Sequence, residues 1–147
     1  MLLVAAAILA LSVTMVSKSP MESQAAGSTG SPGSAWAWGL NGFGQLGNGT
    51  TTNSSTPIAV SLPSGTTVTA IAGGTQHSLA LTSSGQVLAW GYNADGELGN
   101  GTTTDSSIPI AVSLPSGTTV TAVAGGFYHS LALTSSGQVL ALSLIHI

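Results

Sequence analysis

The sequence has no cysteine and almost no charge, and both absences narrow the functions open to it. Only Lys18 is basic, and four residues are acidic: Glu22, Asp95, Glu97 and Asp105. Without cysteine the chain has no disulfides, no thiolate nucleophile and no cysteine-ligated metal. With a single lysine and no arginine it lacks the cations that neutralise nucleic-acid phosphates or bind an anionic membrane surface. We therefore expect no nucleic-acid partner.

A nearly unbroken apolar run occupies residues 1–16. A bilayer-spanning helix needs about 20 such residues, so this run is better suited to a signal peptide cleaved after Ala25. No Lys or Arg precedes the run, which leaves an uncleaved membrane anchor or an internal buried segment as alternatives. We expect an apolar helix in the signal peptide or anchor (residues 1–25) and a flexible linker, rich in Gly and Ser, at 26–34. The protein is then secreted or held in the cell envelope, and touches membrane only through this segment if it is uncleaved.

Two consecutive units of 52 residues, 38–89 and 90–141, agree at 43 positions and differ at nine. Similarity at a fixed period of this length predicts a propeller, solenoid or array, and the period favours a four-stranded propeller blade. Hydrophobic residues make up 43% of the chain and occur in short runs, with no convincing helical period after residue 34. The predicted fold is all-β, a partial β-propeller of about two to three antiparallel four-stranded blades.

Short β-branched runs separated by turn residues place the strands of each unit. The expected strands are 68–72, 77–81, 86–90, 109–113 and 120–124, with two more near residues 35–38 and 57–61. Pro57 and Pro109 are expected to begin their strands, where a missing N–H is tolerated.

The ordered set "AGGTQHSLALTSSGQVLAWGYNADGELGNGT", residues 72–102, resembles the regulator of chromosome condensation repeat family. The resemblance spans residues 35–141 and implies a blade of a seven-bladed β-propeller. It rests on Gly-Gly, His-Ser-Leu-Ala-Leu, Trp-Gly-x-Asn and Gly-x-Leu-Gly in that order, because each part alone is weak.

The recurring residues are expected to hold the scaffold. The tryptophans supply apolar area between sheets, and the glycines permit tight loops. The asparagines form hydrogen bonds with the loop backbone. The leucines pack each loop against its blade. We expect the histidines to be buried and bonded to the backbone of their own blade. These structural residues are Trp38, Gly39, Asn41, Leu46, Gly47, His77, Trp90, Gly91, Asn93, Leu98, Gly99 and His129.

No constellation of residues predicts catalysis, a cofactor or a metal site. A catalytic histidine needs an orienting partner and a nucleophile, and the serines beside His77 and His129, Ser78 and Ser130, are only repeat-equivalent neighbours. Asn93, Asp95 and Glu97 alternate like calcium ligands. The equivalent loop of the preceding unit, "NGFGQLGNG", has no carboxylate, so a solvated loop is the better interpretation. We predict that the protein is not an enzyme.

The nine differences between the units lie mostly in two loops, as expected where a scaffold is kept and its loop tips vary. They are Leu40/Tyr92, Gly42/Ala94, Phe43/Asp95, Gln45/Glu97, Asn53/Asp105, Thr56/Ile108, Ile71/Val123, Thr75/Phe127 and Gln76/Tyr128. We predict a protein-binding face made by Phe43, Tyr92, Asp95, Phe127 and Tyr128, because aromatic residues on rigid loops are typical of binding hot spots. Drift in unselected loops is the alternative.

The expected function is an exported or surface repeat protein whose propeller loops bind a protein partner. The resemblance also implies two alternatives: inhibition of a secreted enzyme such as a β-lactamase, and nucleotide exchange on a small GTPase with chromatin attachment. The signal-like start and the lack of Lys and Arg disfavour the last. Residues 142–147 belong to no repeat and read as a non-native tail resembling a translated sequencing adapter, with a terminal cap strand as the alternative. We expect an incomplete propeller, marginally stable or prone to aggregation, with an exposed sheet edge.

Overall fold

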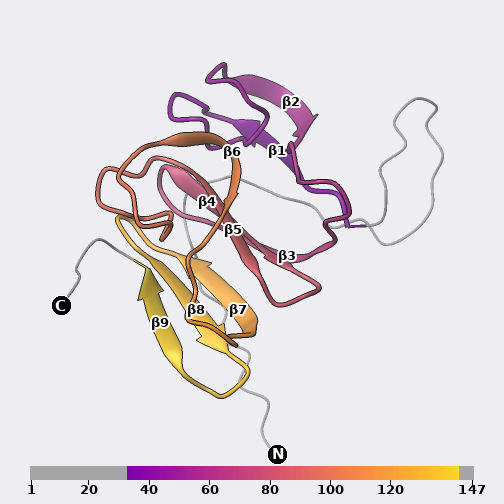
Figure 1. Ribbon diagram of the computed structural model, residues 1–147. Helices are drawn as coiled ribbons and strands as arrows, with labels where there is room; N and C mark the ends of the chain where they lie inside the picture. The colour runs from indigo at the N-terminus through magenta and orange to yellow at the C-terminus, as the bar shows by residue number, and fades with distance from the viewer. Residues whose placement is uncertain (1–32, 143–147) are drawn as a thin grey trace, which may run out of the picture.

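The computed structural model describes residues 33–142, which form nine β-strands and no helix (Figure 1). No membrane-spanning helix is therefore found in this part of the chain. The signal peptide or anchor predicted at 1–25, its expected helix, most of the linker, and residues 143–147 lie outside the described residues. Gly33, near the end of the predicted linker, is held in place, because its carbonyl accepts a 3.0 Å bond from the amide of Val68.

Three antiparallel sheets follow one another along the chain. The first sheet pairs β1 (Trp36–Gly39) with β2 (Ser54–Ala59). The second contains, in order, β3 (Val68–Gly73), β4 (His77–Thr82), β5 (Val87–Gly91) and β6 (Ser106–Ala111). The third contains β7 (Val120–Gly125), β8 (Ser130–Thr134) and β9 (Val139–Leu142). The all-β partial propeller predicted from the repeats is confirmed, with one complete four-stranded blade.

The 52-residue sequence unit does not coincide with a sheet. The unit 38–89 supplies the outer strand β2 of the first sheet and then β3, β4 and most of β5 of the second. The outer strand of the second sheet, β6, comes from the following unit. Each unit therefore joins two neighbouring blades, and neither blade can form from one unit alone.

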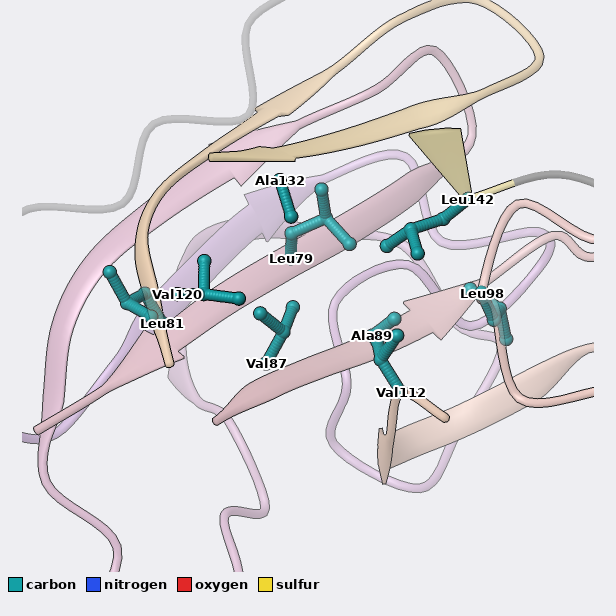
Figure 2. Packing of buried hydrophobic residues seen from close by; sticks show 9 residues of the cluster. All are labelled: Leu79, Leu81, Val87, Ala89, Leu98, Val112, Val120, Ala132 and Leu142. Atoms are coloured by element: carbon teal, nitrogen blue, oxygen red, sulfur yellow. The ribbon is translucent and has the colours of Figure 1, made fainter. Parts of the chain in front are cut away.

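An apolar core fills the space between the second and third sheets, as Figure 2 shows. Leu79, Leu81 and Val87 of the second sheet meet Val120 and Ala132 of the third, and all five are at most 5% exposed. A fully buried Leu or Val contributes about 1.5–3 kcal/mol to stability. The same interface recurs one repeat earlier, where equivalent residues of the first and second sheets form a second core.

The innermost strands of neighbouring sheets approach closely at a glycine. A Cβ atom added to Gly125 at the end of β7 would lie 2.5 Å from the backbone nitrogen of Gly74. The amide of Thr75 also donates a 3.3 Å bond to the carbonyl of Gly126. Only a residue without a side chain permits backbones to pack this tightly.

The positions of the two prolines differ from the prediction. Pro57 and Pro109 lie inside β2 and β6, which start three residues earlier than expected. Each of these strands pairs on one side only within the described sheets, and each pairing has an irregular register. An outer strand with a bulge can accommodate a residue that donates no hydrogen bond.

Leu142 belongs to the fold, although the tail was predicted to begin there. It is the last residue of β9, pairs with Ser130, and is 8% exposed in the core. It stands at the place that Trp90 occupies one repeat earlier. An apolar side chain suffices for this place in the core, so a break in the repeat pattern does not end the strand.

Candidate functional site

The antiparallel strand order gathers the variable loops at one end of the sheets. In the second sheet, the β3–β4 loop (74–76) and the β5–β6 loop (92–105) lie at the same end. Their counterparts are the β1–β2 loop (40–53) and the β7–β8 loop (126–129). We call these four loops together the variable-loop end. All five residues predicted to bind a partner lie on it.

Asparagine side chains fix the long loops from within. The Asn93 amide nitrogen donates to the carbonyls of Thr102 and Thr104, each at 3.0 Å. Its oxygen accepts a 2.9 Å bond from the backbone of Leu98. Asn41 makes the equivalent bonds in the β1–β2 loop. Both asparagines are fully buried, so each loop is held from within by the hydrogen bonds of one buried side chain.

Each long loop is also attached to the next sheet. The carbonyl of Gln45 accepts bonds from the Trp90 indole nitrogen and the Ser78 hydroxyl, both at 2.8 Å. Gly47 has a φ of +68°, and a Cβ atom there would lie 2.6 Å from the indole nitrogen. A glycine is therefore required where the tryptophan packs. One repeat later, the Ser130 hydroxyl bonds the Glu97 carbonyl at 2.9 Å.

Aromatic side chains form two edge-to-face pairs on the variable-loop end. The rings of Phe43 and Tyr92 lie 5.0 Å apart, and those of Phe127 and Tyr128 lie 4.3 Å apart. The second pair is largely in solvent, with Phe127 59% and Tyr128 54% exposed. Edge-to-face pairing stabilises aromatic contacts. Each ring therefore gains a stabilising contact from its partner.

Negative charge is concentrated in the β5–β6 loop. Asp95 and Asp105 are exposed, whereas Glu97 is fully buried. One oxygen of Glu97 accepts a 3.0 Å bond from the amide of Asp95, and the other, Oε1, has no partner. Burial, and then the nearby aspartates, raise the pKa of Glu97. The pKa of Tyr92 is also raised, by partial desolvation and then by the three carboxylates.

The two histidines differ from the prediction and from each other. His77 is 2% exposed, and its Nε2 bonds the Ser130 hydroxyl of the neighbouring sheet at 2.9 Å. The expected bond to its own blade's backbone is absent from its ring, since Nδ1 has no partner. The ring lies against Gly74, where an added Cβ atom would overlap it. Because this glycine leaves room for the ring, the ring can reach the next sheet. His129 is exposed, because no further sheet covers it among the described residues.

The His77–Ser130 pair was not foreseen in the sequence, because the two residues are 53 positions apart. A serine bonded to a histidine resembles a nucleophile with its base. Here, however, the hydroxyl is fully buried and bonded to the Glu97 carbonyl, and no carboxylate orients the imidazole. Burial and then the nearby His129 lower the pKa of His77 to about 4. The pair therefore links two sheets and has no access to a substrate.

Metal binding finds no support in the described part of the chain. Residues 33–142 contain no group of three or more His, Asp or Glu side chains arranged to hold an ion. The alternating Asn93, Asp95 and Glu97 are not brought together as ligands. Asn93 is used by the loop backbone, and Glu97 by the amide of Asp95.

Comparison with known proteins agrees with the repeat pattern and the sheets. The family model "Regulator of chromosome condensation (RCC1) repeat" matches residues 32–81 and 84–133. The chain is 36% identical over 104 residues to the ultraviolet-B receptor UVR8 of Arabidopsis thaliana, covering 71% of this chain and 24% of the receptor. It is 41% identical over 103 residues to the human E3 ubiquitin-protein ligase HERC2, covering 70% of this chain and 2% of the ligase.

Solved structures show the same architecture. The crystal structure of human WBSCR16 superposes with a TM-score of 0.65 at 29% identity, covering 74% of this chain and 29% of that one. Prp20p of Saccharomyces cerevisiae, described with its binding properties to Gsp1p and histones, gives 0.64 at 25% identity, with 74% and 28% covered. The chain thus spans less than a third of the length of these relatives. With two matched repeats over most of the described residues, the chain belongs to the family of regulator of chromosome condensation (RCC1) repeat proteins.

Proposed function

We propose that this chain is part of an exported or surface repeat protein whose variable-loop end binds a protein partner, without catalysis of its own. The observation that carries the proposal is the pair of exposed rings, Phe127 and Tyr128, on a scaffold that is otherwise repeated almost unchanged. Large aromatic side chains dominate binding energy at protein interfaces. Here they replace Thr75 and Gln76 of the preceding repeat.

The rigidity of the loops supports recognition. The buried bonds of Asn41 and Asn93 hold the two long loops in place before any partner arrives. A preformed surface loses less conformational entropy on binding than a mobile one. Loops fixed in this way can therefore present Tyr92 and its neighbours with little ordering cost.

Export is the part of the proposal that rests on residues 1–25. Their apolar run and the small residues before Ala26 favour secretion or the cell envelope. An uncleaved membrane anchor is the alternative. Fractionation of source cells, with mass spectrometry of the mature N-terminus, tests both. A protein that stays in the cytosol with an intact Met1 contradicts export.

Two alternative functions involve different kinds of protein partner. Nucleotide exchange on a small GTPase is favoured by the similarity to yeast Prp20p, which is described with its binding to Gsp1p. Inhibition of a secreted enzyme such as a β-lactamase fits an exported protein better. Accelerated release of labelled GDP from a small GTPase would support the first, and loss of secreted β-lactamase activity on mixing would support the second.

A photo-crosslinking experiment tests binding at the variable-loop end. A photoreactive phenylalanine is placed at Tyr128 in one variant and at Ser83, exposed at the opposite end, in a matched control. Both are expressed in the source cells and irradiated. We expect a discrete protein adduct from position 128 that is absent from position 83. Equal adducts from both ends, or none from position 128, would refute the proposed function.

A further inference from the structure

The same six residues, Gly-Asn-Gly-Thr-Thr-Thr, occur in both long loops, at 47–52 and 99–104. Each copy contains an asparagine, Asn48 or Asn100, that is followed by a glycine. In such a pair the backbone nitrogen of the glycine can attack the side-chain amide of the asparagine, because a glycine has no side chain to hinder the approach. Since the two local sequences are identical, a difference in this reaction must come from the fold.

The side-chain amides of the two asparagines are activated in the same way. Oδ1 of Asn100 accepts a 2.9 Å bond from the Thr102 hydroxyl and a 3.1 Å bond from the Thr102 amide. Oδ1 of Asn48 accepts the same two bonds from Thr50, at 2.9 Å and 3.2 Å. Donors on a carbonyl oxygen stabilise the negative charge that the oxygen gains when its carbon is attacked. Both asparagines are also partly exposed, so water can reach them.

The two attacking amides differ. The Gly49 amide donates a 2.9 Å bond to the carbonyl of Ser107, and a Cβ atom at Gly49 would lie 3.7 Å from the Ile108 side chain. Within residues 33–142 the Gly101 amide donates no hydrogen bond, and a Cβ atom there would have no heavy atom within 4 Å apart from its chain neighbours. An amide bonded to a carbonyl must break that bond before it can attack. Gly101 is therefore the more available nucleophile.

A third Asn–Gly pair, Asn41–Gly42, is protected by burial. The Asn41 side chain is fully buried, and its nitrogen, which would leave as ammonia, donates to the carbonyls of Thr50 and Thr52. The fold thus holds the leaving group at the first pair and the nucleophile at the second. The pair at 100–101 is restrained in neither way.

We propose that Asn100–Gly101 is a site of spontaneous deamidation, where the folded chain converts its own asparagine into aspartate and isoaspartate. The Gly101 nitrogen loses its proton and forms a bond to Cγ of Asn100. The bond from Cγ to Nδ2 then breaks, and the nitrogen leaves as ammonia. A water molecule opens the resulting cyclic imide at either of its carbonyls. The reaction is favoured because both groups are held in one molecule.

The modification changes the β5–β6 loop at one of its internal bonds. Oδ1 of Asn100 also accepts a 3.3 Å bond from the amide of Asn93, the buried side chain that holds this loop. Aspartate adds a negative charge at that place, and isoaspartate also lengthens the backbone by routing it through the side chain. The variable-loop end of an aged chain therefore differs from that of a new one, whether or not it binds a protein.

Peptide mapping of the incubated full chain tests the proposal. The chain is held at neutral and at mildly alkaline pH, and is then digested with pepsin in acid, where the reaction is slow. Mass spectrometry follows each asparagine, and a protein-isoaspartate methyltransferase labels the isoaspartate. We expect Asn100 to react faster than Asn48 by about threefold or more, because the Gly49 amide must first break its bond. Both rates should rise with pH, and Asn41 should react least.

The chain unfolded in urea is the matched control. There the identical local sequences should make Asn48 and Asn100 react at equal rates. In the folded variant Asn100→Gln, whose longer side chain disfavours ring closure, most of the isoaspartate label should be lost. Equal rates in the folded wild type, a faster reaction at Asn48, or the same preference for Asn100 in urea would overturn the proposal. Full retention of the label in Asn100→Gln would do so as well.

Discussion

Glu97 and Gln45 occupy the same place in successive repeats, yet only one of them can carry a charge. Both accept a bond from their loop, and both are nearly or fully buried. The difference between them is therefore electrostatic and is open to measurement by exchange of one residue for the other.

Replacing Glu97 with glutamine is expected to stabilise the chain. The pKa of this carboxyl is raised in the folded state, so its favourable contribution is complete below its ordinary value of 4.5 and is lost as the pH rises. Glu97→Gln should raise the free energy of unfolding at pH 7 by about 1 kcal/mol and change it less near pH 4, where the carboxyl of the wild type is protonated. Urea unfolding at several pH values measures this. The mirror change Gln45→Glu should destabilise; a stabilising effect there would contradict the explanation.

His77 is expected to determine how the free energy of unfolding falls at acid pH. Its pKa is lowered from 6.5 to about 4 in the folded state, so its contribution is complete above pH 6.5 and is lost as the pH falls towards 4. This pKa shift corresponds to about 3 kcal/mol in the free energy of unfolding. His77→Gln should remove most of this acid dependence, whereas His129→Gln, at an exposed site, should retain it. Identical profiles for both variants would show that His77 does not titrate in this way.

At the scale of elements, the attachment of each loop to the following sheet decides how blades join. The Gln45 carbonyl receives the Trp90 indole where Gly47 leaves room for the ring. One repeat later, Leu142 stands beside Gly99 and cannot donate such a bond. The two attachments therefore form a natural comparison of tryptophan with leucine.

Exchanging these residues should change stability in opposite directions. Trp90→Leu removes the indole bond and a large buried ring, and should lower the free energy of unfolding by about 2–4 kcal/mol. Leu142→Trp supplies a donor for the Glu97 carbonyl and should raise it by about 1 kcal/mol. Thermal melts of both variants give the sign and size. Destabilisation by both would mean that the third sheet has no place for the ring.

The strands of this fold were largely predictable, because short β-branched runs and turn glycines recur at a fixed period. The start of β6 was misplaced, since Pro109 looked like the first residue of a strand and not part of a bulge in an outer one. The sequence also does not show which strands belong to the same sheet. A repeat unit can be cut at any point, and hydrogen bonding alone shows that β6 completes the preceding blade.

The candidate site was predictable in part. Loop differences between the repeats pointed to Phe127 and Tyr128, and the structure places both in solvent. The burial of Glu97 and its unpartnered oxygen were hidden, because they depend on how the loop folds back on itself. The contact of His77 with Ser130 also joins different sheets, and no local pattern in the sequence encodes such a contact.

In the molecule as a whole, equivalent apolar residues are buried on the second sheet and exposed on the third. Leu81 and Val87 are 5% and 1% exposed beneath the third sheet. Their counterparts Leu133 and Val139, on the third sheet itself, are 40% and 66% exposed. An apolar sheet face open to water favours association.

Self-association through this face is therefore expected for the isolated chain. Sedimentation should show dimers or larger species whose fraction rises with concentration. Leu133→Thr/Val139→Thr should shift this equilibrium towards monomer by about tenfold, because it removes two exposed apolar side chains. A wild-type monomer with a cooperative melt independent of concentration would contradict the expectation.

The proposed function requires that the variable-loop end binds a protein. The most direct measurement is the affinity of the partner, identified by crosslinking from position 128, for the wild type and for Phe127→Thr/Tyr128→Gln. This exchange installs the residues that the preceding repeat carries in the same loop, so the fold is retained. Loss of two exposed aromatic side chains from a binding site should weaken the affinity by about tenfold or more. An unchanged affinity would contradict binding through these two side chains.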